Sequence, residues 1–273
     1  MSSLHPVVYD LLVRVRTSSG RDIEVCSNPK LSGVAARSLH AAHRGTSCHL
    51  IEYRPSIPPD HAIAHECAHL LAQQDRLEEG RLYYPVIPGT AFADLYARLY
   101  PRRSTGRRDA WSPQDNTRAI DQELWHAEKL VTQVARQAQN FPQDLQIEQW
   151  LSTAFPALAA LQEQALLEDL TCLERMLMPQ ARDRFPPLIL RAHLAMHYAL
   201  TRGYSQRLPY SDLRERAARA LPHYPHPSLG NRLLAAIPDD TSQIYRDEVR
   251  VTTEWMTALD IPHWIYWRKL DAA

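Results

Sequence analysis

The segment at residues 64–71 places two histidines four positions apart in an uncharged stretch, with a glutamate directly after the first histidine. Side chains four residues apart lie on one face of a helix, one turn apart, so His65 and His69 can point at a common ion. Pro59 suits a first helical turn, because the backbone N–H that proline lacks would have no helical partner there. The sequence therefore predicts a helix over residues 59–74 that carries both histidines.

The order His65, Glu66, His69 is typical of a catalytic zinc site. Two imidazole nitrogens can bind one tetrahedral Zn²⁺ at about 2.0–2.1 Å each. Glu66 then lies beside the ion without binding it, where it can act as general base toward a zinc-activated water molecule. Zinc lowers the pKa of such a water toward about 7, so the chemistry can run at neutral pH. We predict Zn²⁺ as cofactor, His65 and His69 as ligands and Glu66 as the catalytic residue.

This motif in its helical setting resembles the zincin (HExxH) metallopeptidases. The short strands and helix expected before it are similar to the small bacterial metallopeptidases of phage-immunity and radiation-response type. The resemblance covers roughly residues 7–74. It implies the same two ligands and the same base, and it leaves the substrate open.

A third ligand has to come from elsewhere. His61 is eight residues from His69, about 12 Å along a helix, so one ion cannot easily reach both. Glu123 resembles the ligand glutamate on the second helix of glutamate-type zincins. The segment around Asp144 and Glu148 resembles one in related predicted bacterial metallopeptidases, in which an aspartate on a later helix completes the site. We favour Asp144, with Glu148 able to orient a histidine N–H instead, and keep Glu148 and Glu123 as alternatives.

The expected fold class is α+β, a small mixed α/β N-terminal unit with the HExxH helix, followed by a mostly α-helical remainder. We expect a zincin-like catalytic unit at 1–153, with an irregular insertion at 75–116, and a helical region at 154–273 packed on it. In the first unit we predict strands at 7–15, 22–26 and 48–53 and a helix at 32–43. Later helices are expected at 91–99, 187–201, 211–221 and 241–259, with Ser211 and Thr241 as N-caps and a leucine stripe from Leu166 to Leu177.

Three side chains on one later segment are candidates for stabilising an oxyanion, namely His193, His197 and Tyr198. The two histidines are four residues apart, so they can also form a second metal pair. More often such histidines are core residues.

Composition limits the compartment and the partners. Lys plus Arg and Asp plus Glu both number 31, so the chain has no overall basic character that would indicate a nucleic-acid partner. The arginine-rich segment at 101–108 reads as a solvated loop, with a lid or docking site as the alternative. No apolar stretch approaches the roughly 18–20 residues of a membrane helix, and the N-terminus shows no secretory pattern. The four cysteines form no CxxC pair, which favours a reducing cytoplasm.

Together these features predict a cytoplasmic, bacterial zinc metallopeptidase, a hydrolase that cleaves a specific protein or peptide substrate. A narrow substrate range is expected, because an unrestrained protease would harm a cytoplasm. The alternative is a non-catalytic module in which zinc only staples helices together, or in which no metal binds and the protein binds a partner. The sequence leaves the cleavage site, oligomeric state and activating signal open.

Overall fold

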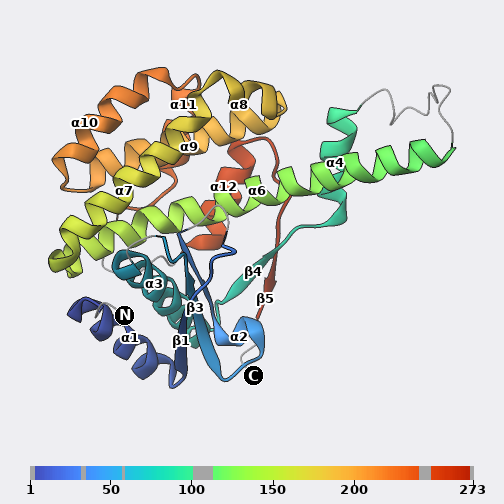
Figure 1. Cartoon of the computed structure of the whole chain (residues 1–273). Helices are drawn as coiled ribbons and strands as arrows, with labels where there is room; N and C mark the ends of the chain where they lie inside the picture. Colours follow the sequence, from blue (N-terminus) through green and yellow to red (C-terminus); the bar gives the residue numbers. More distant parts are fainter. Residues whose placement is uncertain (1–3, 32–34, 57–58, 101–112, 240–246, 271–273) are drawn as a thin grey trace.

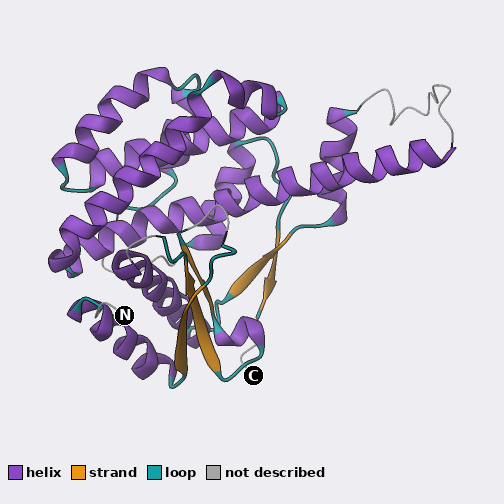
Figure 2. Ribbon diagram, in the orientation of Figure 1, coloured by secondary structure: helices purple, strands orange, loops and turns teal. Residues whose placement is uncertain are grey.

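The computed structural model shows a small sheet with helices at the N-terminal side and a mostly helical remainder, which confirms the α+β class (Figure 2). In Figure 1 the long helix α6 crosses the molecule between the sheet unit and a group of helices on its other side. The structure describes residues 4–31, 35–56, 59–100, 113–239 and 247–270.

The main sheet has three strands in the order β1-β3-β2, so β2 is an edge strand. β1 (Asp22–Ser27) pairs with β3 (Cys48–Tyr53) in parallel, and β2 (Ala36–Leu39) pairs with β3 in antiparallel direction. The strands predicted at 22–26 and 48–53 are therefore confirmed.

The strand predicted at residues 7–15 is wrong, because this segment forms helix α1 (Pro6–Ser19). Its buried residues are Val8, Leu11 and Val15, at spacings of three and four, which is the periodicity of one helical face. Its valines favour strands on propensity alone, and packing against α3 (Pro59–Glu78) outweighs that preference.

The helix predicted at residues 32–43 is also wrong over its described part. That part holds strand β2 and the short helix α2 (Ala41–Arg44), while residues 32–34 lie outside the described ranges. Residues of β2 take partners in β3, from Ala36 opposite Tyr53 to Leu39 opposite Leu50. Sheet pairing thus overrides the helical spacing of the alanines and leucines in this segment.

Helix α3 confirms the helix predicted at residues 59–74 and continues one turn further. It packs against α1, the sheet, α6 and α7. Ile63, Cys67 and Leu70 lie on its buried face in the core shared with α1 and β3. Cys67 is fully buried in that core, and burial raises the pKa of its thiol.

Helix α6 (Pro113–Ala154) is 42 residues long, about 63 Å at 1.5 Å per residue. Its N-terminal half packs on α4 (Gly89–Leu99), which matches the helix expected at 91–99. Strand β4 (Tyr83–Val86), within the segment expected to be irregular, pairs with β5 (Tyr266–Lys269).

The helical group on the other side of α6 surrounds a core that includes Trp255, Trp264 and Tyr204. Leu166, Leu170 and Leu173 form the buried stripe of α7, as predicted. The prediction of Ser211 as an N-cap is wrong, since Ser211 is the first residue of α10 and Tyr210 takes the N-cap position. Residues 240–246, with the expected cap at 241, lie outside the described ranges.

The helices of this group are α7 (Ala159–Glu174), α8 (Pro179–Arg184), α9 (Pro187–Arg207), α10 (Ser211–Ala220), α11 (Pro227–Ala235) and α12 (Glu248–Ala258), with short 3-10 turns η1 (Pro156–Leu158), η2 (Arg175–Leu177) and η3 (Leu221–His223).

The larger hydrophobic core crosses the boundary expected at residue 153, since α4 and α6 contribute to it together with α7, α9 and α12. The division into 1–153 and 154–273 stays a prediction.

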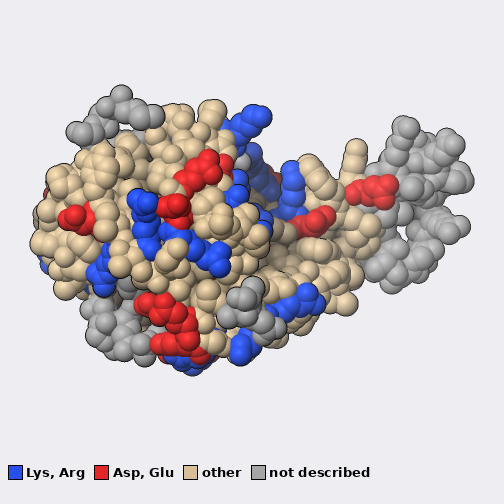
Figure 3. All heavy atoms as spheres, turned by 90° about the horizontal axis from the view of Figure 1, so that it is seen from below, with Lys and Arg blue, Asp and Glu red and all other residues tan. Residues whose placement is uncertain are grey.

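The arginine-rich segment at 101–108 lies outside the described residues. Across the described chain no helix is long and apolar enough to cross a membrane. On the face seen in Figure 3, acidic and basic side chains are interspersed.

Candidate metal centre

The candidate site forms where α3 meets α6. Helix α3 presents His65 and His69 one turn apart, and α6 presents Asp144 and Glu148, also one turn apart. The two helices are in contact, and the four side chains are held at hydrogen-bonding distance from one another. The structure therefore brings together the two predicted histidines with two of the three acids considered as a further ligand.

Three atoms of this group form a small triangle. His65 Nε2 lies 3.1 Å from His69 Nε2. Asp144 Oδ1 lies 3.2 Å from His69 Nε2 and 3.4 Å from His65 Nε2. A tetrahedral ion with ligands at about 2.0–2.1 Å separates those ligands by about 3.3 Å. The triangle thus has the dimensions of one face of a tetrahedral zinc site.

The other nitrogen of His65 explains why its Nε2 is free to bind an ion. His65 Nδ1 lies 2.6 Å from Glu148 Oε1, and an ionised carboxylate can only accept a hydrogen bond. Nδ1 therefore carries the proton, and the Nε2 lone pair faces the triangle. Burial raises the pKa of the Glu148 carboxyl, but the charges and hydrogen bonds of His61 and His65 outweigh burial and lower it.

The triangle favours a positive charge. Burial lowers the pKa of His65, but hydrogen bonds and charges of Asp144 and Glu148 outweigh burial and hold that pKa well above its ordinary value. Two imidazole nitrogens and a carboxylate oxygen facing one another can hold a cation between them, and N/N/O donors are ligands that Zn²⁺ accepts. The residues present therefore fit a zinc ion.

Hydrogen bonds from the helical group hold the Glu148 side chain in place. Gln162 Nε2, on α7, donates to the Glu148 carboxylate at 2.5 Å and to its backbone oxygen at 2.7 Å. The Tyr210 hydroxyl donates to Gln162 Oε1, so the amide of Gln162 can only point its NH₂ toward Glu148. Both residues are buried, and sequence reasoning missed both. Neither has a motif, and only the packing of α7 beside α6, with the start of α10 on α7, brings them to the site.

A second group of potential ligands overlaps the first. His61 Nε2 lies 3.0 Å from Glu148 Oε2, so His61, His65 and Glu148 also come within reach of one ion. In this group each imidazole nitrogen faces a carboxylate oxygen that accepts its proton, and Gln162 occupies the same carboxylate. Ordinary hydrogen bonds therefore satisfy this group without a metal.

Glu66 is almost buried and lines the cleft in front of the triangle, with 8% of its surface exposed. No hydrogen bond or ion pair links its carboxylate to another described residue. A carboxylate beside the site and free of partners fits the role of a base. That role stays a prediction.

Glu123 lies far from this group. Positions 123 and 144 are 21 residues apart on one helix, about 31 Å along its axis. The Tyr96 hydroxyl on α4 donates to the Glu123 carboxylate at 3.4 Å. Helix geometry thus excludes Glu123 from a site that contains Asp144.

The site opens into a cleft with a volume of about 780 Å³. One wall comes from the N-terminal unit and includes residues 35–38 of the β2 edge and residues 83–85 of β4. The other wall comes from α6, α7 and α9. An ion held by the three atoms would therefore face a space large enough for a peptide side chain and its neighbours.

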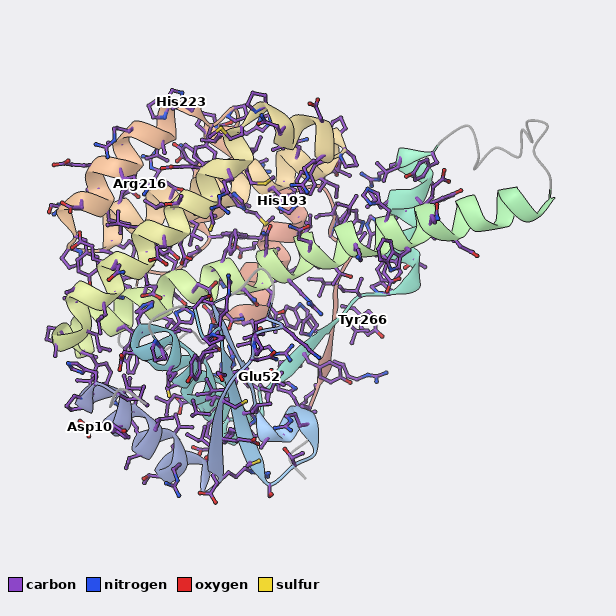
Figure 4. All side chains as sticks on the ribbon, viewed as in Figure 1. Asp10, Glu52, His193, Arg216, His223 and Tyr266 are labelled. Atoms are coloured by element: carbon purple, nitrogen blue, oxygen red, sulfur yellow. The ribbon has the colours of Figure 1, made fainter. Side chains whose placement is uncertain are left out.

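The three side chains considered for the oxyanion lie apart from the triangle. His193 is fully buried, and its Nδ1 lies 2.5 Å from Gln137 Oε1. Figure 4 places His193 inside the helical group. His197 reaches the cleft wall, whereas the Tyr198 hydroxyl accepts a hydrogen bond from Arg202 at 2.8 Å. Of the three, only His197 lines the cleft.

Comparison of the chain with protein-family models, curated proteins and solved structures gave no match. A His/His/carboxylate group between α3 and α6 can hold a metal ion.

Proposed function

We propose that the protein is a zinc-dependent peptidase that hydrolyses a peptide bond in a specific intracellular protein. The observation that carries this proposal is the triangle of His65 Nε2, His69 Nε2 and Asp144 Oδ1, with edges of 3.1–3.4 Å, beside the unpaired carboxylate of Glu66. A site that only staples helices is closed by four protein ligands. Here three donors face a cleft, which favours the catalytic type.

Each residue has a part in the proposed chemistry. A bound zinc ion supplies Lewis acidity, which makes a water molecule acidic near neutral pH and polarises the substrate carbonyl. Glu66 accepts the proton of the attacking water on a carboxylate oxygen and returns it to the leaving amine nitrogen. Glu148 holds the proton on His65 Nδ1, so that Nε2 keeps its lone pair.

The edge of the sheet supports a peptide as substrate. Strand β2 lines the cleft, and in the described part of the chain no strand pairs with its outer edge. An extended peptide can add to such an edge through backbone hydrogen bonds. The second wall, from α7 and α9, narrows the access, which supports a restricted substrate range. We propose a reducing cytoplasm as the compartment, where the four cysteines, all unpaired, would remain thiols.

Metal content and cleavage test this proposal together. Elemental analysis of the purified chain is expected to give about one zinc per molecule, retained in Glu66→Gln. Proteome-wide mapping of new N-termini in cells expressing the wild type, with Glu66→Gln as control, is expected to find a few cleavage sites. Robust digestion of unstructured casein would contradict the narrow range.

Two other outcomes would change the function. Full zinc content without any cleavage that depends on Glu66 would favour a zinc-stapled binding module. No zinc after reconstitution would remove the basis of the peptidase proposal.

A further inference from the structure

The wall of the cleft formed by α6, α7 and α9 is a trough with an apolar floor. Leu173 and Leu200 are almost fully buried in the core beneath it, and Phe141 packs against the same core. On α9 the trough runs from Tyr204 to His197, two helical turns or about 10 Å. Because α6 also carries Asp144, the trough begins at the metal centre.

His197 contributes an unsatisfied acceptor to this trough. Its side chain is 4% exposed, and no hydrogen bond partner lies at its Nε2. Its Nδ1 lies 3.4 Å from the backbone oxygen of Leu173, which can only accept, so the proton sits on Nδ1. Burial and the neighbouring His193 lower the pKa of His197 to about 3, which keeps the ring neutral near pH 7. A ligand that meets Nε2 must therefore donate a hydrogen bond.

Helix α7 adds two carboxylates to the same trough. Glu168 and Asp169 line it and make no ion pair or hydrogen bond with any other described residue. Asp169 and the His197 ring line the same cleft. The Asp169 side chain is exposed at the surface of α7, and its densely packed surroundings together with the charge of Glu148 raise the pKa of its carboxyl. An approaching cation would relieve both effects.

The opposite wall carries the carboxylate of Glu66 beside the metal centre, and two of its arginines are matched by carboxylates. Arg37 contacts Glu52 at 2.5 Å, and Arg76 contacts Glu248 at 2.9 Å. Among the described residues, the carboxylates of Glu168 and Asp169 and the acceptor of His197 give the side of α7 and α9 a negative, hydrogen-bond-accepting character. A ligand group that fits this side has an apolar stem and a charged, hydrogen-bond-donating end.

We propose that this trough is a subsite for a long basic side chain of the substrate, lysine or arginine. The aliphatic stem packs on Phe141, Leu173 and Leu200, Asp169 meets the positive charge, and His197 Nε2 accepts an N–H hydrogen bond. This inference rests on the proposed peptidase function, because it assigns the side chain beside the cleaved bond. It makes Asp169 and His197 specificity residues rather than catalytic ones.

Binding of metal-anchored probes tests the proposal without any substrate. The probes are the hydroxamates of arginine, norleucine and glutamic acid, titrated calorimetrically into the zinc-loaded full chain. The arginine probe is expected to bind at least about tenfold more tightly than the norleucine probe, and the glutamate probe most weakly. Asp169→Asn is expected to bring the arginine-to-norleucine ratio close to one, and His197→Leu to lower it severalfold.

Matched controls come from the same residue types far from the cleft. Asp10 on α1 and His223 beyond α10 lie at opposite ends of the molecule in Figure 4, and both are exposed. Asp10→Asn and His223→Leu are expected to keep the wild-type ratio. Glu168→Gln provides a second test of the carboxylate wall, and circular dichroism checks that each variant is folded.

The outcomes separate this inference from the proposed function. If all three probes bind with equal affinity, or if Asp169→Asn and His197→Leu both keep the wild-type ratio, the basic subsite is wrong while the metal centre stands. If no hydroxamate binds the zinc-loaded chain, the proposed function fails and the inference falls with it.

Discussion

Helices α3 and α9 both carry histidines four residues apart, and the pairs His65/His69 and His193/His197 differ in their surroundings. Of these two pairs, only the first belongs to a group of described residues that can hold a metal ion. On α3, the rings of His65 and His69 lie 4.8 Å apart between centroids, with their Nε2 atoms 3.1 Å apart. On α9, the ring centroids of His193 and His197 lie 6.0 Å apart, and both Nε2 atoms are buried without a partner. The same spacing thus gives two different environments.

The partner helix makes the difference. Helix α6 offers Asp144 and Glu148 to the pair on α3, one carboxylate at the triangle and one behind His65. To His193 the same helix offers only the neutral amide of Gln137. Spacing aligns two imidazoles, but a carboxylate supplies the negative charge that offsets a divalent ion in a buried place.

The largest expected effect comes from removing that charge at the triangle. Asp144→Asn keeps the shape of the side chain and is expected to lower zinc affinity by more than about a hundredfold, beyond the 10–100-fold loss typical of outer partners. Glu123→Gln, on the same helix and far from the site, should keep the wild-type zinc content. Elemental analysis after dialysis measures both, and an unchanged zinc content in Asp144→Asn would assign the third ligand elsewhere.

Removing the metal should weaken the contact between α3 and α6. At a free zinc concentration of about 100 times Kd, binding stabilises the folded state by about 2.7 kcal/mol, so chelation should lower Tm by several degrees. In a His193→Leu variant the shift on chelation should be the same as in the wild type. Differential scanning calorimetry measures the shift in Tm. An unchanged Tm after zinc removal would contradict the expected stabilisation of the folded state by zinc.

A smaller effect is expected from the outer carboxylate. Glu148→Gln can still accept a hydrogen bond from His65 but lacks the charge, so zinc affinity should fall about 10–100-fold. Competition with a chromogenic chelator gives the affinity. Gln143→Ala, one turn away on α6 and bonded to Glu248 instead, is the control. Equal affinity in both variants would show that Glu148 does not support the metal.

The pair on α9 should respond to pH rather than to zinc. Burial lowers the pKa of His193 to about 4 and that of His197 to about 3, below the value of 6.5 expected on unfolding. As pH falls from 6.5 toward 4, the unfolded chain binds protons that the folded chain does not, so stability falls by up to about 1.4 kcal/mol per pH unit for each ring. Urea unfolding of His193→Leu and His197→Leu should show a shallower loss over this range, at unchanged zinc content. A slope equal to that of the wild type would show that these rings are not buried and neutral.

The sequence was most informative where one local pattern determined one element. The helix carrying His65 and His69 follows from its apolar frame and the proline at its start. The strands at 22–26 and 48–53 follow from their own local sequence patterns. Segments with two competing periodicities were misread. Residues 7–15 contain strand-favouring valines at helical spacing, and residues 36–39 contain alanine and leucine that pair with β3.

The candidate site shows the same limit. Its two histidines on α3 were predicted from their spacing alone. Asp144 and Glu148 were predicted only through a resemblance to other metallopeptidases. Gln162 and Tyr210 could not be predicted, because the bond from Gln162 to Glu148 and the bond from Tyr210 to Gln162 depend on how α7 and the start of α10 pack beside α6. Neutral polar residues within helices carry no pattern that marks such a role.

The pairing of β4 with β5 has a consequence for the order in which the cleft is completed. Val86 and Tyr266 are partners although 180 positions separate them in the chain. During synthesis, the cleft wall at Tyr83–Pro85 lacks its neighbouring strand until that whole intervening length has been made. By then α3, α6, α7 and α9 have all been translated, so the potential ligands are present before the wall is paired. In a nascent chain the potential ligands of α3 and α6 can therefore come together before this wall of the cleft is paired.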